Sequence, residues 1–202
     1  MPTNVLAPRG LQYSRNNFAA APNYQGNFYH IKAAYASSIA IGDAVKTGTA
    51  GDLGYVVLAT SADTSILGVF GGVLPFYSPT LQQTYHGNNG SWVASTAANA
   101  AVPCLVVSDP GAEFIAQVNG GVYDESWRGK NIGFANASNG APNFAGQSTL
   151  VLDYASLDTT NTLPFRVLGV AGLPGSAMDP TGTYPWIIVK MNTAEVLNPT
   201  GI

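Results

Sequence analysis

The sequence predicts an all-β protein: a β-barrel or sandwich of about nine short strands with an extended N-terminal arm and at most one or two short helices. Gly, Pro and Asn, which favour turns, occur 23, 13 and 16 times among 202 residues. Between them lie short runs rich in β-branched and aromatic residues. Hydrophobic residues make up 46% of the chain and aromatic ones 10%, whereas disordered chains are poor in both. The chain is therefore expected to fold around a core.

Nine segments have the composition of strands and are bounded by turn-forming residues. In order they are residues 35–45, 54–59, 66–70, 73–77, 102–107, 113–118, 149–154, 163–170 and 186–191. The Gly71-Gly72 pair between the third and fourth predicts a bulge or a sharp bend. Asp109-Pro110-Gly111 predicts the turn between the fifth and sixth, and Asn89-Gly90 is a strong two-residue hairpin signal.

Little of the sequence favours helix. Residues 123–128 can form one short turn, with acidic residues early and Arg128 late, as the helix dipole prefers. Residues 133–148 are small and polar and predict a loop between β segments. The expected organisation is an arm over residues 1–30 and a β-domain over residues 31–202, with a possible subdivision in the loop near 133–148.

The arm is the candidate partner-binding element. Pro, Gly and Asn interrupt every window of residues 1–30, yet the segment keeps large apolar side chains that a free tail would not need. The expected anchors are its two arginines and six large apolar residues: Arg9, Leu11, Tyr13, Arg15, Phe18, Tyr24, Phe28 and Tyr29. The alternative is that the arm wraps its own barrel. If it binds a partner, deletion of residues 1–27 should leave the stability of the free protein nearly unchanged.

Charge excludes several partners. Eight basic and eleven acidic residues give a net charge of −3, and only 9% of residues are charged. No basic cluster exists to neutralise nucleic-acid phosphates or to bind a membrane surface. No apolar run reaches the roughly 18 residues of a spanning helix, and no signal peptide is visible. One cysteine allows no intrachain disulfide. We expect no nucleic-acid or membrane partner and synthesis in the cytoplasm.

No residue set indicates catalysis, so the chain is not expected to be an enzyme or to hold a cofactor or metal. His30 and His86 are isolated, and most aspartates lie beside turn formers. Two histidines and Cys104, which lies in an apolar run, cannot complete a tetrahedral zinc site. Three Trp and ten Tyr leave a sugar-stacking surface open as an alternative.

One arrangement is more specific. Residues 38–45 (Ser-Ile-Ala-Ile-Gly-Asp-Ala-Val) are followed by residues 64–72 (Thr-Ser-Ile-Leu-Gly-Val-Phe-Gly-Gly). Together they resemble the Gly-Asp-x-Val strand start and Ile-x-Gly-Val strand of tailed-bacteriophage capsid decoration (cement) and other head structural proteins. Residues 106–114, 163–169 and 186–192 look similar as well, so the resemblance spans about residues 35–192.

The resemblance implies a non-enzymatic virion protein on the outer capsid surface that stabilises the shell by binding across major capsid protein subunits. Low charge and surplus aromatic residues also favour self-association, with a homotrimer expected before a dimer. The alternatives are another virion component, such as a head fibre or tail protein, and a carbohydrate-binding β module.

Overall fold

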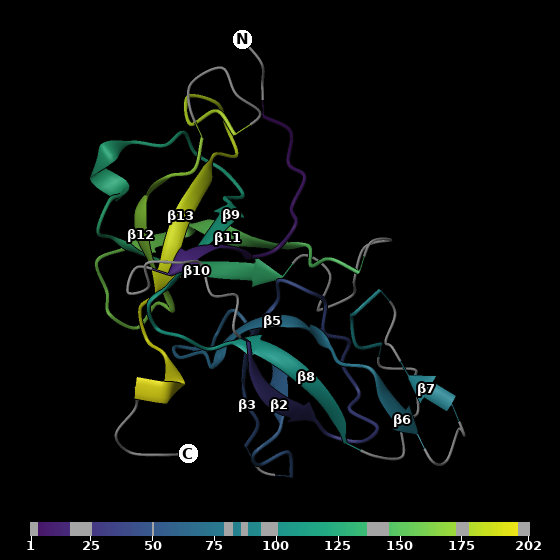
Figure 1. Cartoon of the computed structure of the whole chain (residues 1–202). Coiled ribbons are helices and arrows are strands. Elements are labelled where there is room, and N and C mark those ends of the chain that lie inside the picture. The colour runs from purple at the N-terminus through teal and green to yellow at the C-terminus, as the bar shows by residue number, and fades with distance from the viewer. Residues whose placement is uncertain are drawn as a thin grey trace.

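Two antiparallel β-sheets, one above the other in Figure 1, build the molecule in the computed structural model. The structure describes residues 4–16, 26–49, 51–78, 83–85, 89–93, 101–136, 146–172 and 178–197. Within these ranges the elements that are not strands or loops are two single-turn 3-10 helices, η1 (Glu125–Trp127) and η2 (Glu195–Leu197). The prediction of an all-β fold with at most one or two short helices is confirmed.

The upper sheet has six strands in the order β1-β9-β13-β12-β10-β11. They are β1 (Gln12–Asn16), β9 (Ala112–Gln117), β10 (Asn131–Asn136), β11 (Leu150–Asp158), β12 (Phe165–Val170) and β13 (Trp186–Met191). A bridge between Val118 and Leu152 brings the chain after β9 to β11, so the sheet curls. Side chains alternate along its strands, and Phe114, Val167 and Val189 point to the buried side.

The lower sheet has five strands in the order β2-β8-β5-β3-β4. They are β2 (Asn27–Ile31), β3 (Ala44–Thr47), β4 (Val56–Leu58), β5 (Gly68–Val73) and β8 (Val102–Val107). Its edge strands β2 and β4 also contact each other, so this sheet curls around a core of its own. A separate hairpin of β6 (Phe76–Ser78) and β7 (Gln83–Tyr85) stands beside it (Figure 1).

Two hydrophobic cores follow from this arrangement. The larger core packs the buried side of the six-stranded sheet against Ala44, Val69 and Val107 of the five-stranded sheet, and so holds the two sheets together. The smaller one lies inside the curl of the five-stranded sheet, where Phe70 and Trp92 have no exposed surface. Two antiparallel sheets with a shared core are consistent with the sandwich that the sequence offers beside a barrel.

The predicted bulge after Phe70 and the predicted turn at Asp109-Pro110-Gly111 are confirmed. The pairing of β5 with β8 shifts register between Phe70 and Gly72, which is the expected bulge. Asp109 accepts a hydrogen bond from the Gly111 amide at 2.7 Å and closes the turn that leads from the lower to the upper sheet. Asn89 and Gly90 both have positive φ, as a primed turn requires, but residues 86–88 lie outside the described part and Trp92 bridges Ile39, so the hairpin itself stays a prediction.

The expected arm is corrected by the structure. Gln12–Asn16 pairs with β9 as the edge strand of the upper sheet, and Asn27–Ile31 pairs with β8 in the lower sheet. These strands cannot be recognised from the local sequence, because Gly, Pro and Asn interrupt the alternation of polar and apolar residues. Their hydrogen-bond partners come from strands that are distant in the sequence. The alternative, packing on the chain's own domain, holds for the described residues of the segment. Strands β10 and β11, which flank residues 137–145, pair with each other, so no domain boundary separates them.

Candidate partner-binding surfaces

The N-terminal segment is held by one buried side chain of β9. Gln117, 1% exposed, accepts a hydrogen bond from the Ala7 amide at 2.8 Å and donates one to the Val5 carbonyl at 2.9 Å. Further along, the Leu11 amide donates to the Gly42 carbonyl at 2.9 Å. Sequence reasoning did not single out Gln117; its only signal is an amide at the end of an apolar strand.

Two of the predicted anchors belong to the protein's own core. Leu11 is 3% exposed and packs in the larger core. Tyr13 lies edge-on to Phe114, with ring centroids 6.3 Å apart and the rings 76° from parallel. Leu11 therefore fills the protein's own interior, and half-buried Tyr13 packs against that core rather than in a pocket on a partner.

A third anchor, Arg15, is paired within the chain. Its Nε lies 2.6 Å from Oε2 of Glu113, whose side chain is 3% exposed while that of Arg15 is 64% exposed. The expectation that Arg15 pairs with a partner's carboxylate is corrected in this respect: its carboxylate partner comes from the adjacent strand β9.

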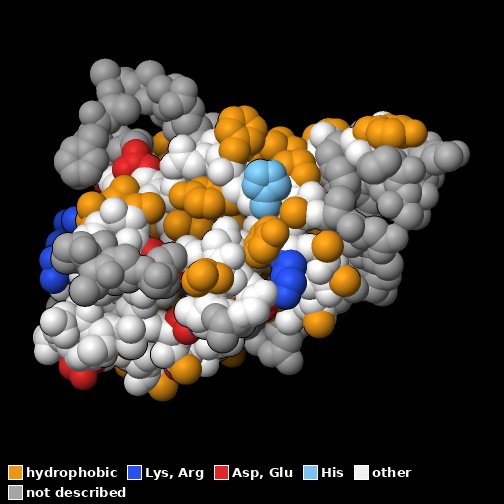
Figure 2. All heavy atoms as spheres, turned by 90° about the horizontal axis from the view of Figure 1, so that it is seen from below, with side chains coloured by type: hydrophobic (Ala, Val, Ile, Leu, Met, Phe, Trp, Pro, Cys, Tyr) orange, Lys and Arg blue, Asp and Glu red, His pale blue; other side chains and the backbone are white. Residues whose placement is uncertain are grey.

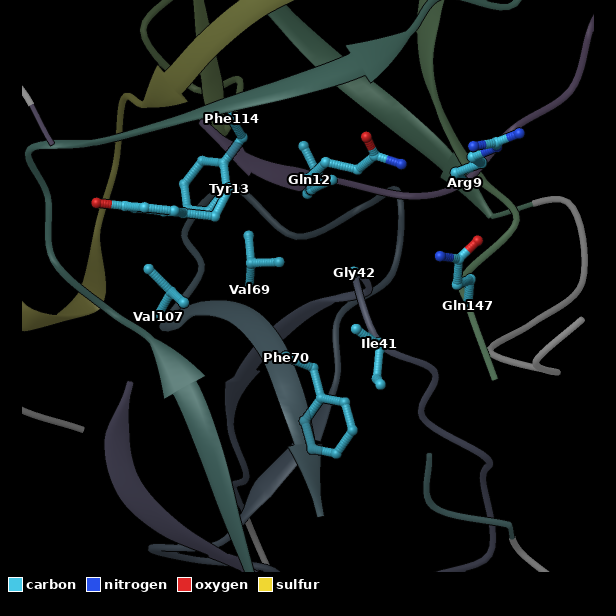
Figure 3. Close-up of a pocket in the computed structure, with 11 residues that line it drawn as sticks. Arg9, Gln12, Tyr13, Ile41, Gly42, Val69, Phe70, Val107, Phe114 and Gln147 are labelled. Carbon is cyan, nitrogen blue, oxygen red and sulfur yellow. The ribbon is translucent and has the colours of Figure 1, made fainter. Parts of the chain in front are cut away.

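Arg9 is exposed at one end of a small cavity between the two sheets (Figure 3). Arg9 and Gln147 lie at one side of this cavity, and Tyr13 and Phe114 lie at the other. Its volume, about 130 Å³, is below the 300 Å³ or so at which ordinary small-molecule sites begin. The cavity is therefore a packing gap with room for a few waters.

The predicted anchors on β2 differ in their exposure to solvent. Phe28 on β2 is 75% exposed, whereas its neighbour Tyr29 is half-buried against the smaller core and its hydroxyl reaches Ser108 Oγ at 3.3 Å. Phe18 and Tyr24 lie outside the described residues. Of the six predicted anchors that the structure describes, Arg9 and Phe28 thus face solvent with no contact that ties them to the chain's own core.

A buried carboxylate joins two distant loops. Asp43 has no exposed surface; its Oδ2 accepts from the Ala40 amide at 2.7 Å and its Oδ1 accepts from the Ser148 hydroxyl. Burial raises the pKa of Asp43 to about 6, against the lowering effect of the bonds from Ser148 and Ala40. The same Ser148 oxygen accepts from the Leu150 amide, so the pair fixes the start of β11.

The other titratable groups form no reactive cluster in the described part of the chain. No three His, Cys, Asp or Glu side chains there lie close enough to hold a metal ion. Burial raises the pKa of the Cys104 thiol to about 12, so at neutral pH it is a core side chain and not a nucleophile. His30 is exposed on β2, and His86 lies outside the described residues.

The tryptophans are not available for stacking on a ligand. Trp92, Trp127 and Trp186 are 0%, 5% and 7% exposed. Trp127 is covered by two tyrosines, Tyr123 at 5.5 Å and Tyr154 at 5.2 Å between ring centroids. A sugar-stacking surface built on tryptophan is thus absent, and Tyr154, 44% exposed, is the solvent-facing edge of this cluster.

The exposed surface carries large apolar side chains instead. Nine of those described are at least 43% exposed: Val5, Leu6, Phe28, Leu53, Tyr77, Val122, Tyr154, Val196 and Leu197. Figure 2, which views the molecule from the side of the five-stranded sheet, shows hydrophobic side chains spread over this face with few charged ones among them. Lys32, Lys46 and Arg128 are engaged in ion pairs with carboxylates of their own chain.

Comparisons of this chain with family models, with curated proteins and with solved structures give no significant match. None of the described helices has the length and hydropathy needed to cross a bilayer.

Proposed function

We propose that this chain is a non-enzymatic virion structural protein that decorates and stabilises a bacteriophage capsid by binding across major capsid protein subunits. The resemblance of residues 35–192 to phage head proteins is what suggests this class of protein. The observation that carries the proposal is the surface: large apolar side chains such as Phe28, Leu53 and Tyr77 are exposed on a chain with 9% charged residues. Such a surface suits a protein that works packed against other proteins.

Stabilisation by a decorating protein follows from mass action. A ligand that binds the assembled shell, and not its separated subunits, lowers the free energy of the shell alone. No bond needs to be made or broken, so no catalytic group is required. A body of two packed sheets with several exposed apolar side chains can contact more than one capsid subunit at once.

Self-association is part of the proposal. A homotrimer, more than a dimer, would bury some of the exposed apolar side chains and match a local three-fold axis of an icosahedral shell. Sedimentation velocity at high micromolar concentration should give a trimer. A monomer both in solution and in density maps of particles would contradict this part of the proposal.

The test of the function is co-sedimentation. Purified protein is mixed with undecorated heads of the phage that encodes the chain and, separately, with unassembled capsid protein. We expect saturable binding to heads, in a fixed ratio to capsid subunits, and a higher temperature of head disruption. Association with tails or with soluble glycans and not with heads would overturn the proposal in favour of a tail component or a carbohydrate-binding module.

Surface variants show which side chains contact the shell. Phe28→Ser, Leu53→Ser, Tyr77→Ser and Val122→Ser each replace an exposed apolar side chain, so the fold should persist. At least one of the four should weaken binding to heads about tenfold, which is the effect of a typical interface anchor. Wild-type binding by all four would exclude this apolar surface as the contact.

A further inference from the structure

A row of polar side chains crosses the outer face of the six-stranded sheet. Strand register places Arg15 opposite Glu113, Glu113 opposite Lys190, Lys190 opposite Arg166, and Arg166 opposite Asn131. Residues directly opposite in antiparallel strands stand on the same face. The neighbours Phe114, Val189, Val167 and Ile132 face the core, which puts this row on the outer side.

Two cations in the middle of the row lack carboxylate partners. Arg15 occupies Glu113 at 2.6 Å, and among the described residues no carboxylate oxygen lies within 4.0 Å of Lys190 or Arg166. The one side-chain partner of Arg166 there is the neutral Asn131, whose Oδ1 accepts from Nε at 3.4 Å. Like charges directly opposite one another destabilise a sheet, so this pair costs the free protein stability that an anion would restore.

The pair lies on a groove of about 490 Å³ where the start of β12 meets the end of β13. Half-buried Pro110 and Leu197, which is 67% exposed, give the groove apolar walls, while the Met191 side chain faces the larger core. Asp109 is the one carboxylate in the lining, and it accepts from the Gly111 amide at 2.7 Å within its turn. The groove therefore combines a net positive end with an apolar surface.

Asn131 prepares Arg166 for an anion. The amide of Asn131 is 2% exposed and donates to the Thr160 carbonyl at 2.7 Å, which fixes the oxygen that Arg166 Nε contacts. The two terminal nitrogens of Arg166 are left for a ligand, and a guanidinium presents them in the spacing of a carboxylate. Nucleic acid does not fit, because it needs a longer series of cations than these two.

We propose that this groove binds an acidic segment of a partner polypeptide, with a carboxylate on Arg166 and Lys190 and an adjacent apolar side chain against Pro110 and Leu197. The two positive charges favour a carboxylate, and the apolar walls beside them favour an apolar side chain, so an acidic peptide with a neighbouring apolar residue matches both. The inference rests on the proposed function in one respect: the capsid protein is the polypeptide expected to supply the segment.

The primary test uses peptides and the isolated protein. The probes are an end-blocked Gly-Glu-Leu-Glu-Leu-Gly peptide and its counterpart with Gln for Glu. Binding is followed by NMR through the Arg166 Nε–Hε and Lys190 signals, up to about 5 mM peptide, a concentration that detects even weak complexes. We expect the acidic peptide to shift these signals, less so as salt is raised. No shift, or equal binding of the Gln peptide, would overturn the proposal.

The matched variants remove two charges each. Arg166→Gln with Lys190→Gln should weaken binding of the acidic peptide about tenfold, the usual effect of losing a charge-assisted hydrogen bond. Arg128→Gln with Lys130→Gln makes the same change of net charge near η1 and should leave binding as in the wild type. Equal loss in both variants would assign the effect to net charge and overturn the groove. If the acidic peptide binds only to a variant that ends at Leu197, the groove belongs to the chain's own residues 198–202 and the proposal is overturned.

Head binding separates this inference from the proposed function. If wild-type protein decorates heads and the Arg166/Lys190 double variant does so equally well, the groove assignment fails and the decoration role stands. If the acidic peptide binds in the groove and heads are not bound, the groove stands and the decoration role fails.

Discussion

Arg15 covers the buried carboxylate of Glu113 and is the only residue described as forming an ion pair with it. Removing the Arg15 side chain leaves the Glu113 carboxylate without its ion-pair partner, although Glu113 stays buried on β9 between β1 and β13. Because Arg15 is itself largely exposed, we expect Arg15→Ala to lower the free energy of unfolding by about 1–2 kcal/mol, below the range for fully buried pairs. Urea unfolding measures this, and Glu113→Gln in the same chain should recover part of the loss. Arg128→Ala, which breaks an exposed pair with Glu125, should leave the unfolding midpoint unchanged.

The N-terminal segment should contribute to stability through its core contact. Leu11→Ala removes a side chain that is 3% exposed in the larger core and should cost about 2–4 kcal/mol of unfolding free energy. Val5→Ala, at a side chain 76% exposed, should change it by less than about 0.5 kcal/mol. Deletion of residues 1–16 should lower the thermal midpoint sharply. A midpoint equal to that of the full chain would restore the view of this segment as a dispensable arm.

Asp43 should make stability depend on pH in mildly acidic solution. Its pKa is about 6 in the folded protein and near 3.8 when unfolded, so the folded state binds more protons between these values. Unfolding free energy therefore falls as pH rises from about 4 to about 6, by at most about 3 kcal/mol for this one group. The lowered pKa of Asp63 acts in the opposite direction, since its contribution is lost as pH falls.

Asp43→Asn isolates that effect. The amide oxygen can accept from the Ala40 amide, and the amide nitrogen can donate to Ser148 Oγ, so the loop contact survives without a charge. We expect the difference in unfolding free energy between variant and wild type to rise in favour of the variant from pH 4 to pH 6.5. A difference independent of pH over this range would show that Asp43 does not titrate there.

Cys104 should report on opening of the smaller core. Its thiol is buried and its pKa is about 12, so it is both inaccessible and protonated in the folded protein at pH 8. Labelling by a thiol reagent should proceed only through unfolding and should speed up in urea in parallel with the unfolding curve. Rapid labelling in native buffer, at a rate that urea leaves unchanged, would mean that β8 is exposed without unfolding.

How much of this could be predicted from sequence depends on where each element finds its partners. Strands β8, β9 and β13 agree with the predicted segments within a residue, because their apolar runs are bounded by clear turn formers. Strand β10 was missed even though Ile132 and Phe134 alternate inward, because Gly and Asn around them are typical of loops. Strand β1 has almost no local pattern and exists because the edge of β9 supplies its hydrogen bonds.

For the candidate surfaces too, the exposure of a side chain depends on which strands pair with its own. Phe28 is exposed because it stands on the outer side of the edge strand β2, and its role in binding a partner stays a prediction. Burial of Leu11 and Tyr13 depends on the strand that lies across from them. Arg166 and Lys190 become neighbours only when β12 and β13 pair, and no spacing in the sequence predicts that order.

The position of β1 has a consequence for how the protein is made. Arg15 and Glu113 are 98 positions apart, and all five strands of the lower sheet lie between them in the chain. On the ribosome, those five strands emerge before β9 does, so the lower sheet can close while β1 still has no strand to pair with. The earliest described strand is therefore among the last to find its place. We therefore expect Leu11 and Tyr13 to stay exposed to solvent until β9 is made, and this is the stage at which a chaperone would protect the chain from aggregation.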